Sequence, residues 1–356
     1  MSVAVAMVGC GWWPTRVLLP ALATDPDAQI AALVDPDRAR LAATAQAFGV
    51  AQERTFATTE AMLDAVAPEA AIVAVPHALH HPVARLLLER GVHLLLEKPM
   101  TIEPAHAREL VALAAARGAH LLLDYPYNFN PQALTLQRAL AAGRIGAVEH
   151  VSCLYGSTVR ALYGGDPEPY REAFGYPVNA PAATTYSDPA LSGGGQGQTQ
   201  LTHAIALLLA VSGLRPAAVC AFTAGFELPV DLADAVAVQF EGGAVGTLAS
   251  AGNVLPGQRE VVRCELFGRD GHVLFDVNAG VATIHGAEGA VERLPTPPAP
   301  ERNPEPVVVG HLVDVVLGRA VNRVPGELGL AAVEVVAALY RSAAERRVVE
   351  LEELRP

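Results

Sequence analysis

The sequence of 356 residues predicts an α/β protein with two parts. Residues 1–124 are expected to form a doubly wound parallel sheet, and residues 125–356 an α+β part with an open, mostly antiparallel sheet. In the first half, short apolar runs alternate with segments of helical periodicity. In the second half, apolar residues recur at every other position, with Gly-Gly or Asp-Gly between runs. The length also exceeds what a single hydrophobic core usually supports.

Composition excludes several classes of function. A net charge of −12 provides no basic surface for nucleic acid or for anionic membranes. The chain has no basic leader, no apolar run of membrane-spanning length and no CxxC pair. The four scattered cysteines favour reduced thiols, and therefore a soluble cytoplasmic protein without a metal site. They are Cys10, Cys153, Cys220 and Cys264.

The N-terminal residues predict a nucleotide-binding βαβ unit. Strand, glycine turn, helix and second strand are expected at residues 3–8, 9–11, 16–24 and 29–34. Gly9 would make the tight turn, Gly11 would let a pyrophosphate approach the backbone, and the helix start would offer free N–H groups. Asp35 follows the second strand, where its carboxylate can bind the adenosine ribose and repel a 2′-phosphate. This pattern predicts NAD in preference to NADP.

The glycine fingerprint is incomplete, because its third position is Pro14. Proline is tolerated in a first helical turn, where its missing N–H has no intrahelical partner. Trp12 and Trp13 precede it. Their indoles are expected either to cover the pyrophosphate and line the cleft, or simply to pack on the neighbouring helix.

The alternation continues through the first half. Further strands are expected at residues 70–75, 92–96 and 120–123, and helices at 38–48, 59–67, 81–90 and 104–117. Ligands of such sheets bind beyond the carboxyl ends of the strands, so Gly9, Asp35, Pro76 and Lys98 should share one crevice. There the Lys98 ammonium could lose its proton near neutral pH and take part in proton transfer. The alternative is a lysine that merely points into solvent.

The second half changes character after residue 124. Residues 124–131 are interpreted as a hinge, 131–142 as a helix, 295–306 as an exposed proline-rich connector, and 307–317 and 328–346 as closing helices that can pack back on the first part. Strands are expected at residues 148–154, 217–226, 232–240, 244–250, 261–267, 273–277 and 281–285.

A long segment, residues 162–191, leads into a glycine- and glutamine-rich stretch that ends at His203. Long loops in compact domains are usually functional. Glutamines are costly to bury without partners, which favours a wall that binds a polyhydroxylated ligand. The alternative is a flexible loop that caps the following helix.

Together these residues resemble the glucose–fructose oxidoreductase / inositol dehydrogenase family of nicotinamide-dependent sugar oxidoreductases. The resemblance runs nearly from end to end. It is carried by Val8 to Gly11, Leu19 to Leu22, Val34-Asp35, Val75 to His77 with His80, Gly91 to His93, Glu97-Lys98-Pro99, Phe129 to Pro131, Gly193 to Gly195 with His203, and Ser342 with Val348-Val349. It implies a Rossmann domain, a second open-sheet domain and a sugar held between them.

The resemblance also implies roles for particular residues. Lys98 and His203 would be catalytic, and the Lys98–Pro99 bond is often cis in such proteins. Cofactor contacts are expected from Gly9, Gly11, Trp12, Trp13, Asp35, Pro76, His77, His80, Glu97 and Lys98. Substrate contacts are expected from Tyr125, Asn128, Tyr186, Asp188, Thr199, Gln200 and His203.

Two departures bear on the catalytic set. The aspartate that such proteins commonly carry four residues before the histidine is Thr199 here, and the usual arginine is Asn128. Either Lys98 and His203 act alone, or Asp124 or Asp188 supplies the carboxylate.

The resulting hypothesis is an NAD-dependent oxidoreductase acting on a secondary hydroxyl of a sugar, glycoside, aminoglycoside or cyclitol. Lys98 or His203 would handle the proton. Two alternatives are an NAD-assisted glycoside hydrolase or lyase and a non-catalytic NAD-binding sensor. A homodimer or homotetramer formed through the C-terminal sheet is expected.

Overall fold

The computed structural model of the chain describes residues 2–169 and 184–355. Its first sheet is parallel, with strand order β3-β2-β1-β4-β5-β6. The strands are β1 (Val3–Val8), β2 (Ala28–Val34), β3 (Thr55–Phe56), β4 (Ala70–Val73), β5 (His93–Leu96) and β6 (Leu121–Leu123). The direction of the strand order reverses between β1 and β4. This reversal creates a crevice at the carboxyl ends of the strands, where ligands of such sheets bind.

Helices connect these strands, as the apolar alternation predicts. They are η1 (Pro14–Leu18), α1 (Leu19–Thr24), α2 (Arg38–Phe48), η2 (Gln52–Arg54), α3 (Thr59–Ala65), η3 (His77–Leu79), α4 (His80–Glu89) and α5 (Pro104–Arg117). Sequence patterns missed β3, because a two-residue edge strand has no measurable period. Cap signals set the boundaries well: the Asp37 side chain accepts from the N–H groups of Ala39 and Arg40 at the start of α2.

The second sheet is mixed and mostly antiparallel, with order β14-β13-β12-β11-β7-β10-β9-β8-β15. Its strands are β7 (Val148–Gly156), β8 (Pro216–Ala224), β9 (Ala233–Phe240), β10 (Val245–Ala251), β11 (Val261–Gly268), β12 (Gly271–Asp276), β13 (Val281–His285), β14 (Val291–Arg293) and β15 (Val349–Glu350). Only β7 and β10 pair in parallel among these described strands. The predicted fold class is therefore confirmed for both sheets.

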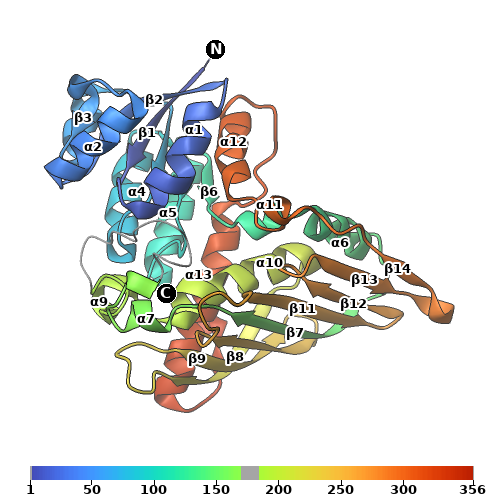
Figure 1. Ribbon diagram of the computed structural model, residues 1–356. Coiled ribbons are helices and arrows are strands. Elements are labelled where there is room, and N and C mark those ends of the chain that lie inside the picture. Colours follow the sequence, from blue (N-terminus) through green and yellow to red (C-terminus); the bar gives the residue numbers. More distant parts are fainter. Residues whose placement is uncertain (1, 170–183, 356) are drawn as a thin grey trace.

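Helices cover one face of this sheet and separate it from the first one (Figure 1). Those of the second half are η4 (Pro126–Phe129), α6 (Pro131–Ala141), α7 (Arg160–Tyr163), α9 (Pro189–Ser192), η5 (Gly197–Leu201), α10 (Thr202–Ser212), η6 (Ala287–Gly289), α11 (Ala299–Arg302), α12 (Glu305–Val316), α13 (Gly326–Glu345) and η7 (Leu351–Leu354). Helix α10 packs on β7 and β11, and α13 packs on β8. Both helices are strongly apolar along these contacts, as burial between layers requires.

The closing helices also contact the first half of the chain. Helix α12 packs against α1 and β5, and α13 packs against α5. A partly buried ion pair joins Arg108 of α5 to Glu334 of α13 at 2.7 Å. The N–H of Leu123 donates to the carbonyl of Val324 at 2.9 Å. Residues distant in sequence thus hold the two sheets in a fixed relation.

Three details correct the sequence-based expectations. The segment read as an exposed connector contains α11, and α12 already begins at Glu305. The helical segment that ends at Ser212 begins at Gln196 and includes η5 and α10, so the glutamine-rich stretch is largely helical. Cys153 and Cys264, far apart in sequence, are buried directly opposite each other on β7 and β11, with sulfur atoms 2.8 Å apart. All four cysteines are free thiols.

Candidate active site

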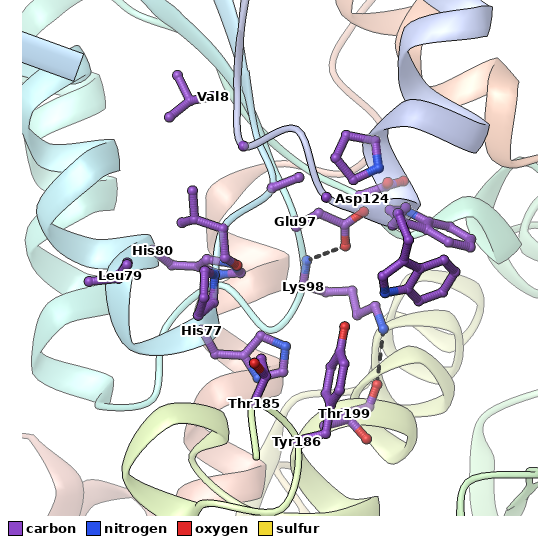
Figure 2. A pocket seen from close by; sticks show the side chains of 18 of the residues that line it. Val8, His77, Leu79, His80, Glu97, Lys98, Asp124, Thr185, Tyr186 and Thr199 are labelled. Carbon is purple, nitrogen blue, oxygen red and sulfur yellow. Dashed lines mark hydrogen bonds between the residues drawn. The ribbon is translucent and has the colours of Figure 1, made fainter. Parts of the chain in front are cut away.

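One cavity of about 490 Å³ opens between the two halves of the chain, at the carboxyl ends of the parallel strands (Figure 2). Every residue expected to contact the cofactor lies on its wall. These are Gly9, Gly11, Trp12, Trp13, Asp35, Pro76, His77, His80, Glu97 and Lys98. The convergence follows from the sheet, because parallel strands end at a common edge.

The turn after β1 fits a pyrophosphate. Gly9 has φ +98°, and a Cβ there would lie 2.1 Å from the Ala74 carbonyl oxygen, so only glycine suits the position. A Cβ on Gly11 would meet no atom within 4 Å, which leaves open space in front of the backbone. The indole N–H of Trp13 is buried without a hydrogen-bond partner in the described structure. These groups suit an anionic ligand at a helix start.

Asp35 marks the opposite end of the nucleotide site. One carboxylate oxygen accepts from the Cys10 N–H and the other from the Asp37 N–H, each at 2.9 Å. The Arg40 guanidinium lies 3.5 Å from Asp35 and 3.3 Å from Asp37. Arg40 is therefore shared between two carboxylates, and Asp35 is held rigidly at the end of β2.

Two histidines support the wall beside β4. The ring of His77 is bonded through Nδ1 to the Ser192 carbonyl at 2.8 Å. His80 faces two carbonyl oxygens, Pro99 at 2.7 Å and Val75 at 2.9 Å. Burial lowers the pKa of His80 to about 4, so the ring is neutral and donates its one N–H to one of these two carbonyl groups. Both ring nitrogens thus face the backbone, and His80 positions the turn after Lys98.

Lys98 points into the cavity from the end of β5 (Figure 2). Its side-chain ammonium donates to the Thr199 main-chain carbonyl at 3.1 Å. Its main-chain N–H donates to the Glu97 carboxylate, also at 3.1 Å. The Lys98–Pro99 bond is cis. Lys98 is therefore tied to the second half of the chain.

Thr199 belongs to the π-helical turn η5, which precedes α10. Its hydroxyl is hydrogen-bonded to the hydroxyl of Tyr163. Turns of this kind interrupt α-helices most often at functional sites. The hydroxyl at this position is thus bonded to a tyrosine hydroxyl, and the lysine contacts the main chain of the same residue.

His203 lies one turn further along, with a side chain 8 % exposed. Its Nδ1 is buried without a hydrogen-bond partner in the described structure. Burial, and secondarily the charge of Lys98, hold the pKa of His203 well below its usual value, so the imidazole is neutral. The buried surroundings therefore make His203 a much weaker base than a histidine in water.

Three tyrosines frame His203. The rings of Tyr125, Tyr127 and Tyr155 lie 5.9, 5.7 and 6.1 Å from its ring, centroid to centroid. The hydroxyl groups of Tyr127 and Tyr155 are 3.2 Å apart. Burial raises the pKa of all three phenols, so they remain neutral donors.

The comparisons with known proteins agree with this architecture. A family model described as "Oxidoreductase family, NAD-binding Rossmann fold" matches residues 3–125, and the GFO/IDH/MocA C-terminal domain matches residues 133–274. The chain belongs to the Gfo/Idh/MocA oxidoreductase family. The family model's NAD-binding part coincides with the parallel sheet and with the glycine turn described above.

Relatives within the Gfo/Idh/MocA family act on several sugars. The chain is 34% identical over 140 residues to a Streptomyces antibioticus dTDP-3,4-didehydro-2,6-dideoxy-alpha-D-glucose 3-reductase, covering 39% of this chain and 42% of that protein. It is 29% identical over 158 residues to the Escherichia coli D-glucoside 3-dehydrogenase, covering 44% and 43%. These matches thus span less than half of each curated relative.

A solved structure matches over almost the whole length. GenD2 from gentamicin A biosynthesis, crystallised in complex with NAD, is 27% identical with a TM-score of 0.78, over 98% of this chain and 96% of that chain. The two-sheet arrangement of the Gfo/Idh/MocA family therefore extends across this protein.

Four of the seven residues expected to contact substrate line the cavity, namely Tyr186, Thr199, Gln200 and His203. The other three do not. Tyr125 is buried with its hydroxyl 3.0 Å from that of Thr202, Asn128 is buried behind the wall, and Asp188 caps α9 by accepting from the Ala190 N–H. Asp188 therefore cannot replace the family aspartate where it stands, whereas Asp124 does line the cavity.

The glutamine-rich wall is also mostly structural. Gln196 accepts from the Ser157 hydroxyl at 2.9 Å, and Gln198 donates to the Thr101 carbonyl at 3.3 Å. Asp231 anchors the segment by accepting from the N–H groups of Gly195 and Gly197, each at 2.7 Å. Only Gln200 of the three glutamines reaches the cavity.

Sequence patterns missed several cavity residues. They are Arg40, Tyr127, Tyr155, Tyr163, Thr185, Glu260, Asn303 and Glu305. Most lie at element ends or in the proline-rich stretch, where no periodicity marks them. Within the described ranges, no set of three His, Cys, Asp or Glu side chains is arranged to hold a metal ion, and no helix is long and apolar enough to cross a membrane.

Proposed function

We propose that this protein uses NAD to oxidise a secondary hydroxyl group of a sugar, glycoside, aminoglycoside or cyclitol. The observation that carries the proposal is the Lys98 ammonium, fixed on the Thr199 carbonyl at 3.1 Å and facing the cavity that also contains His203. The sugar-directed activities named for the curated relatives support the substrate class.

NAD would be held by the turn at Gly9 and Gly11, by the indoles of Trp12 and Trp13, and by Asp35. When bound, it supplies a hydride acceptor at nicotinamide C4. A carboxylate at Asp35 repels a 2′-phosphate, and Arg40 is already shared between Asp35 and Asp37. This arrangement favours NAD over NADP.

Lys98 and His203 would handle the proton of the reacting hydroxyl. Neutral His203 has a buried Nδ1 without a protein partner, and Lys98 has donors left after its contact with Thr199. In the oxidation direction, the hydroxyl proton passes to neutral His203, or to Lys98 after its ammonium has lost a proton, as the carbinol carbon loses its hydride. Thr199, Gln200 and Tyr186 would orient the other hydroxyl groups.

The open face of the nine-stranded sheet would join copies of the chain into a homodimer or homotetramer. Phe222 is 75% exposed there, and Leu154, Val245 and Phe267 are exposed on the same sheet. Isolated apolar side chains are ordinary on a surface, but a set across one sheet face is typical of an interface. Light scattering of the native chain and of Phe222→Ser tests this: the native chain should be oligomeric, and a native monomer would contradict it.

The test of the activity is a screen of sugars, glycosides, aminoglycosides and cyclitols for NADH absorbance, with NADP in parallel. NADH formation from at least one compound is expected, with NAD preferred. Release of an aglycone without net NADH would indicate an NAD-assisted hydrolase or lyase instead. NAD binding without either product would indicate a sensor.

A further inference from the structure

Acidic side chains outnumber cations at the inner end of the cavity. Four carboxyl groups line it near Lys98, and they come from four separate elements. They are Glu97 after β5, Asp124 after β6, Glu260 before β11 and Glu305 at the start of α12. Among the described lining residues the cations are Lys98 and Arg40, and Arg40 is paired with Asp35. With a neutral sugar bound, burial keeps the pKa of Asp124 and Glu305 raised, so these carboxyl groups would be balanced by protons and not by a cation.

Two of these carboxyl groups have oxygens without a donor. Glu97 Oε1 and Asp124 Oδ1 are buried without a hydrogen-bond partner in the described structure, in side chains of residues 9% and 2% exposed. Burial and the charge of Glu97 hold the pKa of Asp124 well above its usual value, which favours a proton held between these two carboxyl groups. A ligand that brings donors would satisfy the oxygens that this proton does not reach.

The other two carboxyl groups come from the second half of the chain, which also contributes Thr199 and His203 to the cavity. Glu260 accepts from the Thr158 N–H at 3.0 Å, and Glu305 accepts from the Asn303 amide at 2.8 Å. These bonds hold the two side chains in place through one oxygen each and leave a second oxygen for a ligand.

Aromatic rings complete this side of the cavity. The ring centroids of Tyr127 and Tyr155 are 6.3 Å apart. After burial, the negative charges of Glu260 and Glu305 contribute to the raised pKa of both phenols. Tyrosine faces attract cations, and combined with carboxylates they suit an ammonium group.

We propose that Glu260 and Glu305 bind an ammonium group of the substrate against Tyr127 and Tyr155, so that the substrate is an amino sugar or an aminocyclitol. The inference rests on the proposed function for the reaction, but it concerns binding alone. The carboxyl groups of Glu97 and Asp124 lie at the strand ends, on the side where the nicotinamide would be held.

The raised pKa of the Glu305 carboxyl group agrees with a role in binding an ammonium group. Burial, followed by repulsion from Glu97, raises the pKa of Glu305 to about 8. An ammonium ion nearby would supply the missing counter-charge and favour the ionised carboxylate. Binding of an amine at neutral pH should then release protons from Glu305.

The test is calorimetric titration of the full chain with NAD present. The probes are D-glucosamine, 3-amino-3-deoxy-D-glucose and 2-deoxystreptamine, each compared with its N-acetylated and hydroxyl counterparts. At least one amine should bind about tenfold or more tightly than both counterparts, as charge-assisted hydrogen bonds require. Added salt should weaken this preference.

Isosteric variants assign the preference to residues. Glu305→Gln and Glu260→Gln should each reduce amine affinity by about tenfold and leave the neutral counterparts nearly unchanged. Glu241→Gln removes the same charge from an exposed hairpin position that does not line the cavity, and it should change nothing. The two carboxyl variants are independent, so failure of one to fold leaves the other as the test.

Equal affinity for the amines and for their counterparts would overturn the inference, and so would a failure of both to bind. A preference for amines that persists in both Glu305→Gln and Glu260→Gln would also overturn it. Because binding is measured without turnover, the outcome is separable from the reaction. Selective amine binding without NADH formation would contradict the proposed oxidation alone. NADH formation from neutral sugars without amine preference would contradict the ammonium site alone.

Discussion

The Lys98 ammonium donates to the main-chain carbonyl of Thr199 at 3.1 Å, across 101 positions of sequence. This contact joins the end of β5 to the π-helical turn η5. It gives Lys98 a fixed position in a protein whose threonine stands where related proteins commonly have an aspartate. A main-chain acceptor orients the lysine without adding a buried negative charge, and this fixed lysine underlies the account of the site.

His203 is expected to contribute through its neutral form. His203→Asn keeps a polar side chain of similar size but removes the imidazole, so turnover should fall by about 10²-fold while NAD affinity stays within a few-fold. Steady-state kinetics with the best substrate of the screen measure this. Turnover equal to that of the native protein would show that His203 has no part in proton transfer.

Asp35 is expected to set the choice of nucleotide. In Asp35→Ser the repelling carboxylate is gone, and Arg40, which then pairs with Asp37 alone, can also contact a 2′-phosphate. The ratio of NADP to NAD affinity should rise by about tenfold or more. The chain has two tryptophans, and both line the cavity, so quenching of their fluorescence provides the affinities. An unchanged ratio would remove Asp35 from nucleotide selection.

The π-helical turn depends on Asp231 for its anchorage. This carboxylate accepts from the N–H groups of Gly195 and Gly197 and from the Tyr340 hydroxyl, at 2.7, 2.7 and 2.9 Å. Asp231→Ala leaves three buried donors unpaired and should reduce the free energy of unfolding by about 3 kcal/mol. Denaturant unfolding measures the change, with Asp231→Asn expected to be intermediate. A loss below about 1 kcal/mol would show that the turn is held by other contacts.

Stability of the nucleotide-free protein should fall as pH rises from about 7 to about 8, a range in which the histidines whose pKa burial lowers are largely neutral in both the folded and the unfolded state. Burial raises the pKa of Glu305 from 4.5 to about 8, and burial with the neighbouring Asp231 raises that of Asp234 from 3.8 to about 8. The folded state therefore binds protons more tightly than the unfolded state between those values. Each group lowers the unfolding free energy by at most about 1.4 kcal/mol per pH unit in that window.

Thermal unfolding between about pH 7 and about pH 8 tests this dependence. Glu305→Gln and Asp234→Asn should each flatten the profile, because an amide does not titrate. A native profile that rises through this window, or variants with the native slope, would contradict the assignment of these two groups.

The sequence predicted the parallel sheet and the convergence of its strand ends on one cavity, because apolar period, glycine turns and strand ends are local signals. It predicted fewer of the cavity residues that the second half of the chain contributes, for physical reasons. Asp188 caps a short helix, and Glu305, hidden among prolines, begins one. Gln196 and Gln198 satisfy backbone and side-chain partners that are far away in sequence. Such pairings arise from tertiary packing and leave no periodic pattern.

The role of Lys98 is the central claim, and the Lys98→Met variant tests it most directly. Turnover of the best substrate and NAD affinity, from tryptophan quenching, are measured on the same preparation. The account predicts a loss of turnover of about 10²-fold or more with NAD affinity nearly intact. Turnover at the native level in this variant would contradict the account.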